Sequence, residues 1–230
     1  MAVISKNQVS FAGEFAVLSN LAAVFALALL TPAVGADIYA HENFVVIWGR
    51  IDRGDDAVFK ETVTLATRKI YLVSPGGHLD PALRIAVMVR DREYETVVGP
   101  PLGSARGRVC ASGCAIIWFA GKTRRILPGA RIGLHSAATA VGRNTRSDSG
   151  NAMMIAYLRS LGTVPEWVLS LIEETEPTAM HYINDDEVTQ LGLDSRPSLP
   201  AWLQENLRGY LFPSTKGGTP DWLKDAVRGQ

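Results

Sequence analysis

Two short apolar runs, separated by a stretch of mixed polarity, lie between residues 44 and 73. Phe44 to Trp48 and Lys69 to Val73 are rich in residues that favour strands, and the first run is continuous enough to be buried on both faces of a sheet. Between them, Asp55 to Thr67 carries apolar residues among charged ones, which predicts a helix. Strand, helix and strand in this order form the unit that builds parallel sheets, so the pattern predicts an α/β fold.

The same alternation continues through the middle of the chain. Ser74 to Gly77 ends the second strand, and Asp80-Pro81 supplies the residues favoured at the N-cap and first turn of a following helix. Tyr94 to Val98 predicts a third strand, and the wholly apolar Ala115 to Ala120 predicts a buried helix. Ile126 to Leu134 predicts two short extended segments on either side of a Pro-Gly turn.

Helical spacing of apolar residues characterises the last third of the chain. It begins near Ala152 and predicts helices there. Leu199 to Leu211 and Asp221 to Val227 are amphipathic pieces joined by the linker Pro213 to Pro220. The pattern contains no internal repeat. We therefore predict a single α/β domain over residues 37–196, followed by a C-terminal helical extension over residues 197–230.

The N-terminal segment has the features of a signal peptide. Lys6 precedes an apolar stretch whose uninterrupted part, Leu21 to Leu30, is ten residues long, too short for a helix that spans a bilayer. Val34-Gly35-Ala36 places small residues where a signal peptidase cleaves, so we predict that residues 1–36 are removed after Ala36. An uncleaved membrane anchor remains the alternative. Export would bring the mature chain into an oxidising compartment.

Charge and composition exclude several classes of function. The 230 residues include 23 basic and 23 acidic side chains, and a net charge of zero offers no field that attracts phosphate backbones. We therefore expect no nucleic-acid partner. Two cysteines are too few for a disulfide framework, and four scattered histidines lack the spacing of metal ligands. We expect no metal and no cofactor, so any chemistry must come from side chains and backbone.

Three features in order along the chain supply candidate chemistry. Gly76-Gly77 ends a strand, where freed backbone amides can point into a cleft. Ser112 sits where an extended segment turns into the buried helix, so it is a candidate nucleophile with the Gly113 amide beside it, although a serine there can equally be an N-cap. His135 ends a predicted strand and is a candidate base, although an isolated histidine is more often structural.

The two cysteines flank the candidate nucleophile. Cys110 and Cys114 lie two residues before and two residues after Ser112. In an oxidising compartment they can form a disulfide across the turn, because Cα atoms four residues apart can fall within bridging distance. Two small buried apolar side chains are an equally weighted alternative. A cysteine nucleophile is a third, weaker alternative.

Four segments resemble, in order, the motif series of the ClpP-type serine peptidases within the crotonase-like superfamily. They are Ser74-Pro75-Gly76-Gly77, Ala111-Ser112-Gly113 with Gly121, Leu127 to His135, and Tyr182 to Leu193. The resemblance extends from about Val45 to Gly192. It implies a ClpP/crotonase-like spiral of β-β-α units with Ser112 as nucleophile, His135 as base, and the amides of Gly77 and Gly113 as oxyanion hole. The exported, cysteine-flanked form resembles the periplasmic ClpP-related proteins of bacteria.

The chain departs from that motif series at the third member of the catalytic triad. The position of the family's aspartate falls at or beside Met180, and no carboxylate is present there. Glu174, Glu176 and Asp185 are close in sequence and are alternative partners for His135, although surface charges are the commoner role of such residues. The resemblance therefore implies a Ser-His dyad or an incomplete triad.

These expectations define the function predicted from sequence and its rivals. We expect an exported serine peptidase that acts on a peptide or protein substrate in the bacterial periplasm. Fold relatives assemble into rings, which makes a homo-oligomer plausible by analogy, and no ATPase partner is expected where ATP is scarce. One rival is a catalytically inactive scaffold that binds an extended peptide. The other is an acyl-CoA-processing enzyme of the crotonase-like type.

Overall fold

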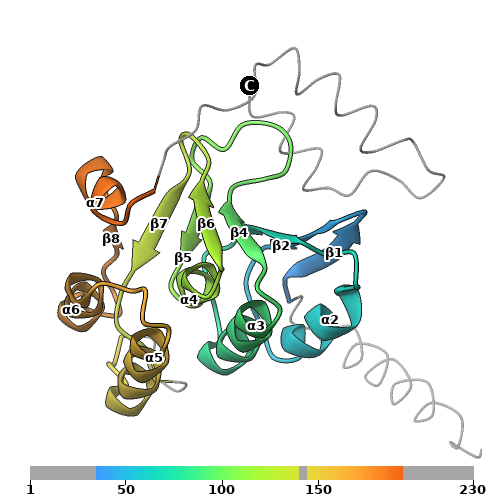
Figure 1. Cartoon of the computed structure of the whole chain (residues 1–230). Helices are drawn as coiled ribbons and strands as arrows, with labels where there is room; N and C mark the ends of the chain where they lie inside the picture. The colour runs from blue at the N-terminus through green and yellow to red at the C-terminus, as the bar shows by residue number, and fades with distance from the viewer. Residues whose placement is uncertain (1–34, 140–143, 194–230) are drawn as a thin grey trace, which may run out of the picture. The chain divides into compact units, whose positions relative to one another are not determined.

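The computed structural model describes residues 35–139 and 144–193. Residues 1–34 of the predicted signal segment and the whole predicted C-terminal extension, Leu199 to Leu211 and Asp221 to Val227 included, lie outside these residues. The elements in chain order are β1 (Asp37–His41), β2 (Phe44–Trp48), α2 (Asp55–Thr62), β3 (Lys69–Val73), α3 (Leu79–Asp91), β4 (Glu95–Val98), β5 (Val109–Ala111), α4 (Gly113–Phe119), β6 (Thr123–Ile126), β7 (Arg131–Leu134), α5 (Asp148–Ser160), α6 (Glu166–Glu174), β8 (His181–Tyr182) and α7 (Asp185–Gln190) (Figure 1).

The strands form two sheets. The larger has the order β1-β2-β3-β4-β6, in which β2, β3, β4 and β6 are parallel and β1 pairs antiparallel with β2 at the edge. The smaller has the order β5-β7-β8, with β5 and β7 parallel and β7 and β8 antiparallel. The parallel α/β architecture predicted from the alternation of strands and helices is confirmed.

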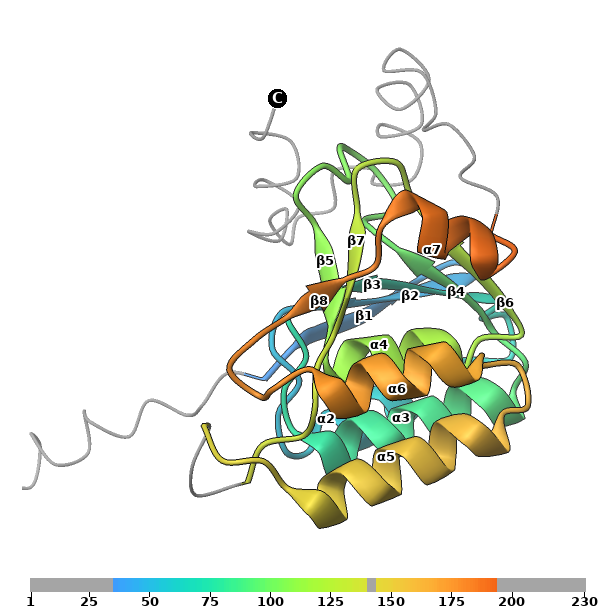
Figure 2. The ribbon, with the colours of Figure 1, turned by 90° about the vertical axis from the view of Figure 1, so that its left-hand side faces the viewer.

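The helices α3, α4, α5 and α6 lie on one side of the five-stranded sheet (Figure 2). The α4 helix contacts β3, β4 and α3, and every residue of α4 is buried, as expected for a helix that is apolar on all sides. The α3 helix buries Ala82, Ile85, Ala86 and Val89, which form one stripe along it. Because α4 is enclosed by other elements, its first residues are held in a fixed position below the sheet.

Strand prediction was most accurate where the apolar runs are fully buried. The β2 and β3 strands have the predicted bounds, and the α2 helix begins at Asp55 as predicted but ends at Thr62, because Val63 is already extended. The N-cap of α3 is His78, so the prediction of Asp80 as N-cap was wrong. The β1 strand was not predicted, because it lies at the sheet edge and each of its residues is half-buried or exposed, so it has no apolar run.

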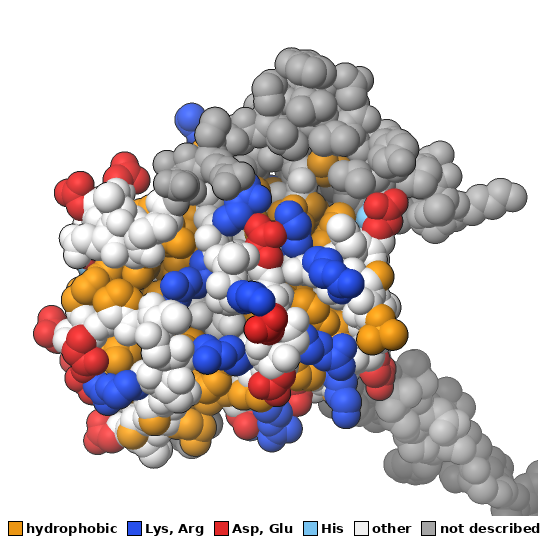
Figure 3. Space-filling model, in the orientation of Figure 1, with side chains coloured by type: hydrophobic (Ala, Val, Ile, Leu, Met, Phe, Trp, Pro, Cys, Tyr) orange, Lys and Arg blue, Asp and Glu red, His pale blue; other side chains and the backbone are white. Residues whose placement is uncertain are grey.

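Lys and Arg side chains are interspersed with Asp and Glu on the face seen in Figure 3, and ion pairs link neighbouring strands of the larger sheet. The Glu95 carboxylate of β4 forms ion pairs with Lys69 of β3 at 3.1 Å and with Arg125 of β6 at 3.4 Å. These groups are partly exposed, so each pair stabilises the sheet by no more than about 1 kcal/mol. Among the described helices, none combines the length and apolar composition needed to cross a bilayer.

Candidate active site

Ser112 occupies a sharp turn between β5 and α4. Its backbone has φ 54° and ψ −126°, a conformation that non-glycine residues rarely adopt and that costs roughly 1–3 kcal/mol. The Ser112 amide donates to the Gly133 carbonyl at 2.9 Å, and its carbonyl accepts from Ala115 at 2.9 Å, so the turn is fixed on both sides. Ser112 stands at the N-cap position of α4, but its side chain makes no capping hydrogen bond. The strained backbone therefore presents a hydroxyl that the helix does not use.

A disulfide joins the residues on either side of this turn. Cys110 on β5 and Cys114 on α4 are both fully buried and bonded to each other, with their Cα atoms 5.2 Å apart. The bond connects the end of the strand to the first turn of the helix and encloses Ser112. Both sulfur atoms are in the disulfide, so neither cysteine is a nucleophile in this state.

The glycine pair Gly76-Gly77 packs directly against the Ser112 turn. A Cβ on Gly76 would lie 2.7 Å from Ser112 Cβ and 2.9 Å from the Gly113 nitrogen, and a Cβ on Gly77 would overlap the Ile51 carbonyl. Both glycines have positive φ, at 88° and 153°. The loop is held in place because the His78 amide donates to Ile51 at 3.0 Å. A side chain at either glycine would displace the loop or the nucleophile turn.

Two backbone amides face the same space from these two segments. The Gly113 Cβ position is 3.7 Å from the Gly77 nitrogen, which brings the two residues side by side. Within the part of the chain that the structure describes, neither the Gly77 nor the Gly113 amide has a hydrogen-bond partner. Both residues line the cavity that also contains Ser112. Free donors beside a nucleophile are the arrangement that stabilises a developing oxyanion.

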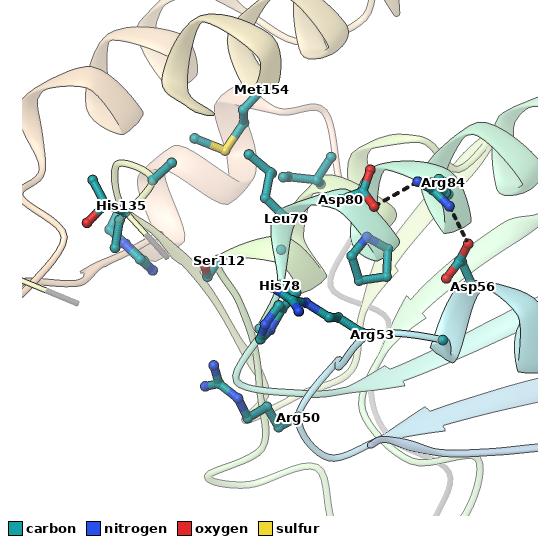
Figure 4. A pocket seen from close by; sticks show the side chains of 18 residues that line it. Arg50, Arg53, Asp56, His78, Leu79, Asp80, Arg84, Ser112, His135 and Met154 are labelled. Carbon is teal, nitrogen blue, oxygen red and sulfur yellow. Dashed lines mark hydrogen bonds and ion pairs between the residues drawn. The ribbon is translucent and has the colours of Figure 1, made fainter. Parts of the chain in front are cut away.

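The cavity that contains these groups has a volume of about 660 Å³. Gly77, Ser112, Gly113 and His135 line it, together with Met154 of α5 (Figure 4). Ser112 and His135 also line a second, nearly filled apolar space of about 10 Å³ between α4, β7 and α5. The sequence therefore predicted a set of residues that the fold brings into one cavity.

His135 follows β7 and reaches the cavity from the smaller sheet. Its Nδ1 lies 2.7 Å from the Ser136 carbonyl oxygen, a geometry that fits an Nδ1–H donating to that carbonyl and leaves Nε2 as the basic nitrogen. Burial lowers the pKa of His135 below its ordinary value of 6.5, and the hydrogen bond to Ser136 opposes that shift. Among the hydrogen bonds of the described residues, none joins the ring to Ser112 Oγ.

The β7–β8 ladder ends just before His135. Gly133 pairs with Tyr182 and Leu134 with His181, so Met180 directly precedes the first paired residue of β8. The Met180 side chain covers Gly133, where a Cβ would lie 2.6 Å from the Met180 sulfur. The residue that the sequence count gives for the family's acid is thus an apolar side chain packed on β7, two residues before His135.

The three carboxylates considered as alternative partners do not reach the imidazole. Glu174, Glu176 and Asp185 make no hydrogen bond or ion pair with His135, and the same holds for every other carboxylate in residues 35–139 and 144–193. The nearby His181 pairs with Glu187 instead, at 3.0 Å. The described part of the chain therefore gives His135 a backbone carbonyl as partner where a triad would have an acid.

One polar side chain near the site was not identified from the sequence. Asn151 on α5 is 4% exposed, and its Oδ1 accepts a hydrogen bond from the Ala137 amide at 2.6 Å. A signal was present in the sequence, because Asn151 shares the buried stripe of α5 with Ile155 and Leu158 at positions i, i+4 and i+7. A polar residue in such a stripe requires a partner, which the sequence does not reveal.

The opposite wall of the cavity carries charged side chains. Arg84 pairs with Asp80 at 2.9 Å and with Asp56 at 3.4 Å. His78, beside Gly77, lies 3.6 Å from Asp52. Arg50 and Arg53 also line the cavity and point along its lower edge in Figure 4. This wall is polar, whereas the space beneath Ser112 is apolar.

Comparison with known proteins identifies the fold. No family model matches the chain, and no curated protein matches its sequence. Among solved structures, a serine-to-alanine mutant of the 1510-N membrane-bound stomatin-specific protease superposes with a TM-score of 0.51 and 19% identity, covering 74% of this chain and 84% of that one. The ClpP protease catalytic domain from Plasmodium falciparum gives a TM-score of 0.47 with 19% identity, covering 69% and 87%. ClpP1 from Listeria monocytogenes gives 0.46 with 16% identity, covering 66% and 91%.

The chain has the ClpP/crotonase-like fold. The fold class predicted from the sequence motifs is therefore confirmed, and the protein provides a scaffold like that of peptidases. At 16–19% identity, the similarity establishes the fold and not the chemistry. In this ClpP/crotonase-like domain, three segments distant in sequence converge on one cavity: the Gly76-Gly77 loop, the Ser112 turn and the end of β7.

Proposed function

We propose that the protein is a serine peptidase that acts through a Ser112–His135 dyad. One observation carries this proposal: a serine in a strained backbone conformation, with no capping hydrogen bond, shares a cavity with a histidine and two unpaired glycine amides. Backbone strain of this kind is found at functional sites, where the surrounding structure maintains it.

In the first step, Nε2 of His135 removes the proton from Ser112 Oγ, and the oxygen forms a bond to the carbonyl carbon of a peptide. The carbonyl oxygen gains the negative charge and accepts hydrogen bonds from the Gly77 and Gly113 amides. The imidazolium then gives its proton to the leaving amine as the carbon–nitrogen bond breaks. This step leaves an acyl group on Ser112.

The second step repeats the proton transfers with water. His135 removes a proton from water, the resulting hydroxide attacks the acyl carbon, and Ser112 recovers its proton from His135 when the ester bond breaks. Loss of the acid that orients the histidine reduces kcat about ten-thousand-fold in a serine protease whose geometry is otherwise intact. We therefore expect slow turnover of peptide bonds.

A fluorophosphonate probe tests the nucleophile directly, because such probes phosphonylate activated serines. We expect the wild type to react with the probe and to cleave an unstructured protein slowly, and Ser112→Ala to abolish both. Ser149→Ala is the matched control, since Ser149 is exposed at the start of α5, away from the cavity. Equal labelling of wild type and Ser112→Ala would exclude a Ser112 nucleophile.

A non-catalytic peptide-binding scaffold is the second candidate function, and one observation favours it. Met180, the residue that the sequence count gives for the family's acid, carries no carboxylate and packs on Gly133 of β7. A scaffold would bind unstructured peptides with the same affinity in wild type and Ser112→Ala, and neither would release products. Turnover that depends on Ser112 excludes the scaffold.

We extend the proposal to the compartment and the assembly. The mature chain would act in the bacterial periplasm as a homo-oligomer, without an ATPase partner and without a cofactor. Cell fractionation followed by intact-mass measurement tests the first part, with a mature N-terminus at Asp37 as the expected result. Sedimentation of the purified mature chain tests the second, and a monomer at micromolar concentration would contradict it.

A further inference from the structure

The peptide group between Ser136 and Ala137 is hydrogen-bonded at both ends. Its carbonyl oxygen lies 2.7 Å from His135 Nδ1, and its N–H donates to Asn151 Oδ1 at 2.6 Å. One rigid planar unit therefore connects the imidazole of His135 to the buried amide of Asn151. We infer that Asn151 is a positioning residue that holds this peptide group, and that the peptide group does for His135 what a carboxylate does in a triad. The inference rests on the proposed function of Ser112 and His135.

The orientation of the Asn151 amide follows from its partners. Its Oδ1 meets the Ala137 N–H, whereas its Nδ2 is buried with no hydrogen-bond partner within the described residues. The reverse orientation would place two donors against each other, so the oxygen must face Ala137. Asn151 leaves one buried donor without a partner, which costs roughly 1–3 kcal/mol. The contribution of the Asn151 side chain at this site therefore comes from its oxygen, which accepts the Ala137 hydrogen bond.

The Ser136–Ala137 peptide group together with Asn151, here called the relay, determines which ring nitrogen of His135 carries the proton. A carbonyl only accepts hydrogen bonds, so the Ser136 oxygen requires a proton on Nδ1, and the neutral ring then carries its lone pair on Nε2, the nitrogen needed by the dyad. Because Asn151 accepts from the N–H of the same peptide, it also polarises the carbonyl toward the imidazole. A neutral peptide group stabilises an imidazolium less than a carboxylate does.

Among the described residues, no charged side chain takes the place of this peptide group beside His135. Met180 packs on Gly133, two residues before His135, and the other charged or titratable side chains that line the cavity are Arg50, Arg53, Asp56, His78, Asp80 and Arg84. None of them forms an ion pair with His135, and those with acidic groups are engaged on the opposite wall. The peptide group is thus the ring's polar partner within the described residues.

Two substitutions at Asn151 separate positioning from packing. Asn151→Asp keeps an acceptor for the Ala137 amide and adds a negative charge, so it should raise the pKa of His135 by about half a unit. Asn151→Leu removes the acceptor at similar volume, so it should lower the rate of fluorophosphonate labelling about tenfold, the equivalent of one lost hydrogen bond. Thr96→Val is the matched control, since it removes a buried hydrogen bond to Trp118 away from the cavity.

Long-range ¹H–¹⁵N NMR of the histidine rings provides the deciding measurement, since it reports tautomer and pKa without requiring activity. We expect wild-type His135 to carry its proton on Nδ1 when neutral, with the pKa raised in Asn151→Asp and the tautomer preference weakened in Asn151→Leu. Thr96→Val should change neither. A neutral His135 with the proton on Nε2, or a pKa that is the same in wild type and Asn151→Asp, would overturn the inference.

The same variants distinguish failure of the inference from failure of the proposed function. If the NMR response is as expected but the probe labels no variant at Ser112, the relay exists and the peptidase proposal fails. If labelling depends on Ser112 but is unchanged in Asn151→Leu, the dyad acts without the relay and the inference fails. Should Asn151→Leu not fold, the tautomer of wild-type His135 decides, because a neutral ring with its proton on Nε2 could not donate to the Ser136 carbonyl on which the inference depends.

Discussion

The Met180 sulfur covers Gly133 of β7, two residues before His135, since a Cβ on Gly133 would lie 2.6 Å from it. Positions 133 and 135 of an extended segment share a face, so an acid at position 180 could reach the imidazole. The thioether supplies bulk and no charge. The ring of His135 instead donates its Nδ1–H to a carbonyl of its own segment.

An acid introduced at position 180 should make His135 a stronger base for Ser112. We expect Met180→Asp to raise the pKa of His135, because a carboxylate stabilises the imidazolium, and to increase the fluorophosphonate labelling rate at least tenfold. Met153→Asp is the control, since Met153 is a methionine of α5 that is 56% exposed. Labelling rates measured at neutral pH check this prediction. A slower rate in Met180→Asp with an intact fold would mean that the register does not deliver the new carboxylate to the ring.

The pH dependence of labelling should show the lowered pKa of His135. Burial disfavours the charged imidazolium, so the neutral base persists below pH 6.5, the ordinary value. We expect the labelling rate to be level at neutral pH and to reach half its maximum only below pH 6.5. Stability should change in the same window: the unfolded chain binds the proton more readily, so the free energy of unfolding falls as the pH drops below 6.5. A half-maximal rate above pH 7 would contradict this account of the environment.

Gly76 should tolerate no side chain. A Cβ there would approach both Ser112 Cβ and the Gly113 nitrogen at less than van der Waals distance, so Gly76→Ala must displace the nucleophile turn. We expect complete loss of labelling. Gly107→Ala serves as control, because Gly107 also has positive φ but has open space around its Cβ position. That control should lose about 1 kcal/mol of stability and keep its labelling rate.

The Cys110–Cys114 disulfide should stabilise the fold modestly and the Ser112 turn strongly. Closing so short a loop removes little entropy from the unfolded chain and contributes about 2 kcal/mol in the chain-entropy model. We expect the variant with both cysteines replaced by alanine to melt a few degrees lower and to label more slowly, because the turn is no longer enclosed. Thermal denaturation and labelling of the two proteins in parallel provide the check. Unchanged labelling in a folded double variant would show that the backbone hydrogen bonds of Ser112 suffice.

The features that the sequence revealed correctly depend on local chemistry. The β2 strand is a continuous apolar run buried almost throughout, and β3 is a run of strand-favouring residues of which three are buried, so the bounds of both follow from composition. Ser112 and His135 stood out through motifs that require glycine or small residues around them, and the structure gives a steric reason for Gly76 and Gly77. The count from the end of the last motif led to Met180, which packs on Gly133 in the same part of the fold as His135.

The features that the sequence did not reveal depend on contacts between distant segments. Asp80 has good N-cap chemistry, yet the α3 helix begins earlier, because the loop anchored by His78 on Ile51 fixes where the chain enters the helix. The hydrogen bond between Asn151 and Ala137 joins residues 14 apart across a loop, and no local pattern predicts it. The edge strand β1 lacks an apolar run because one of its sides faces away from the core.

Mapping the site of the fluorophosphonate adduct tests the central claim most directly. Cleavage after Arg108 and Lys122 releases the peptide Val109 to Lys122, in which Ser112 is the single hydroxyl-bearing residue. We predict that the adduct mass appears on this peptide, at a rate that falls at acidic pH as His135 is protonated. An adduct found only on other peptides, or none after prolonged exposure of the folded mature protein, would contradict the proposal that Ser112 and His135 form a catalytic dyad.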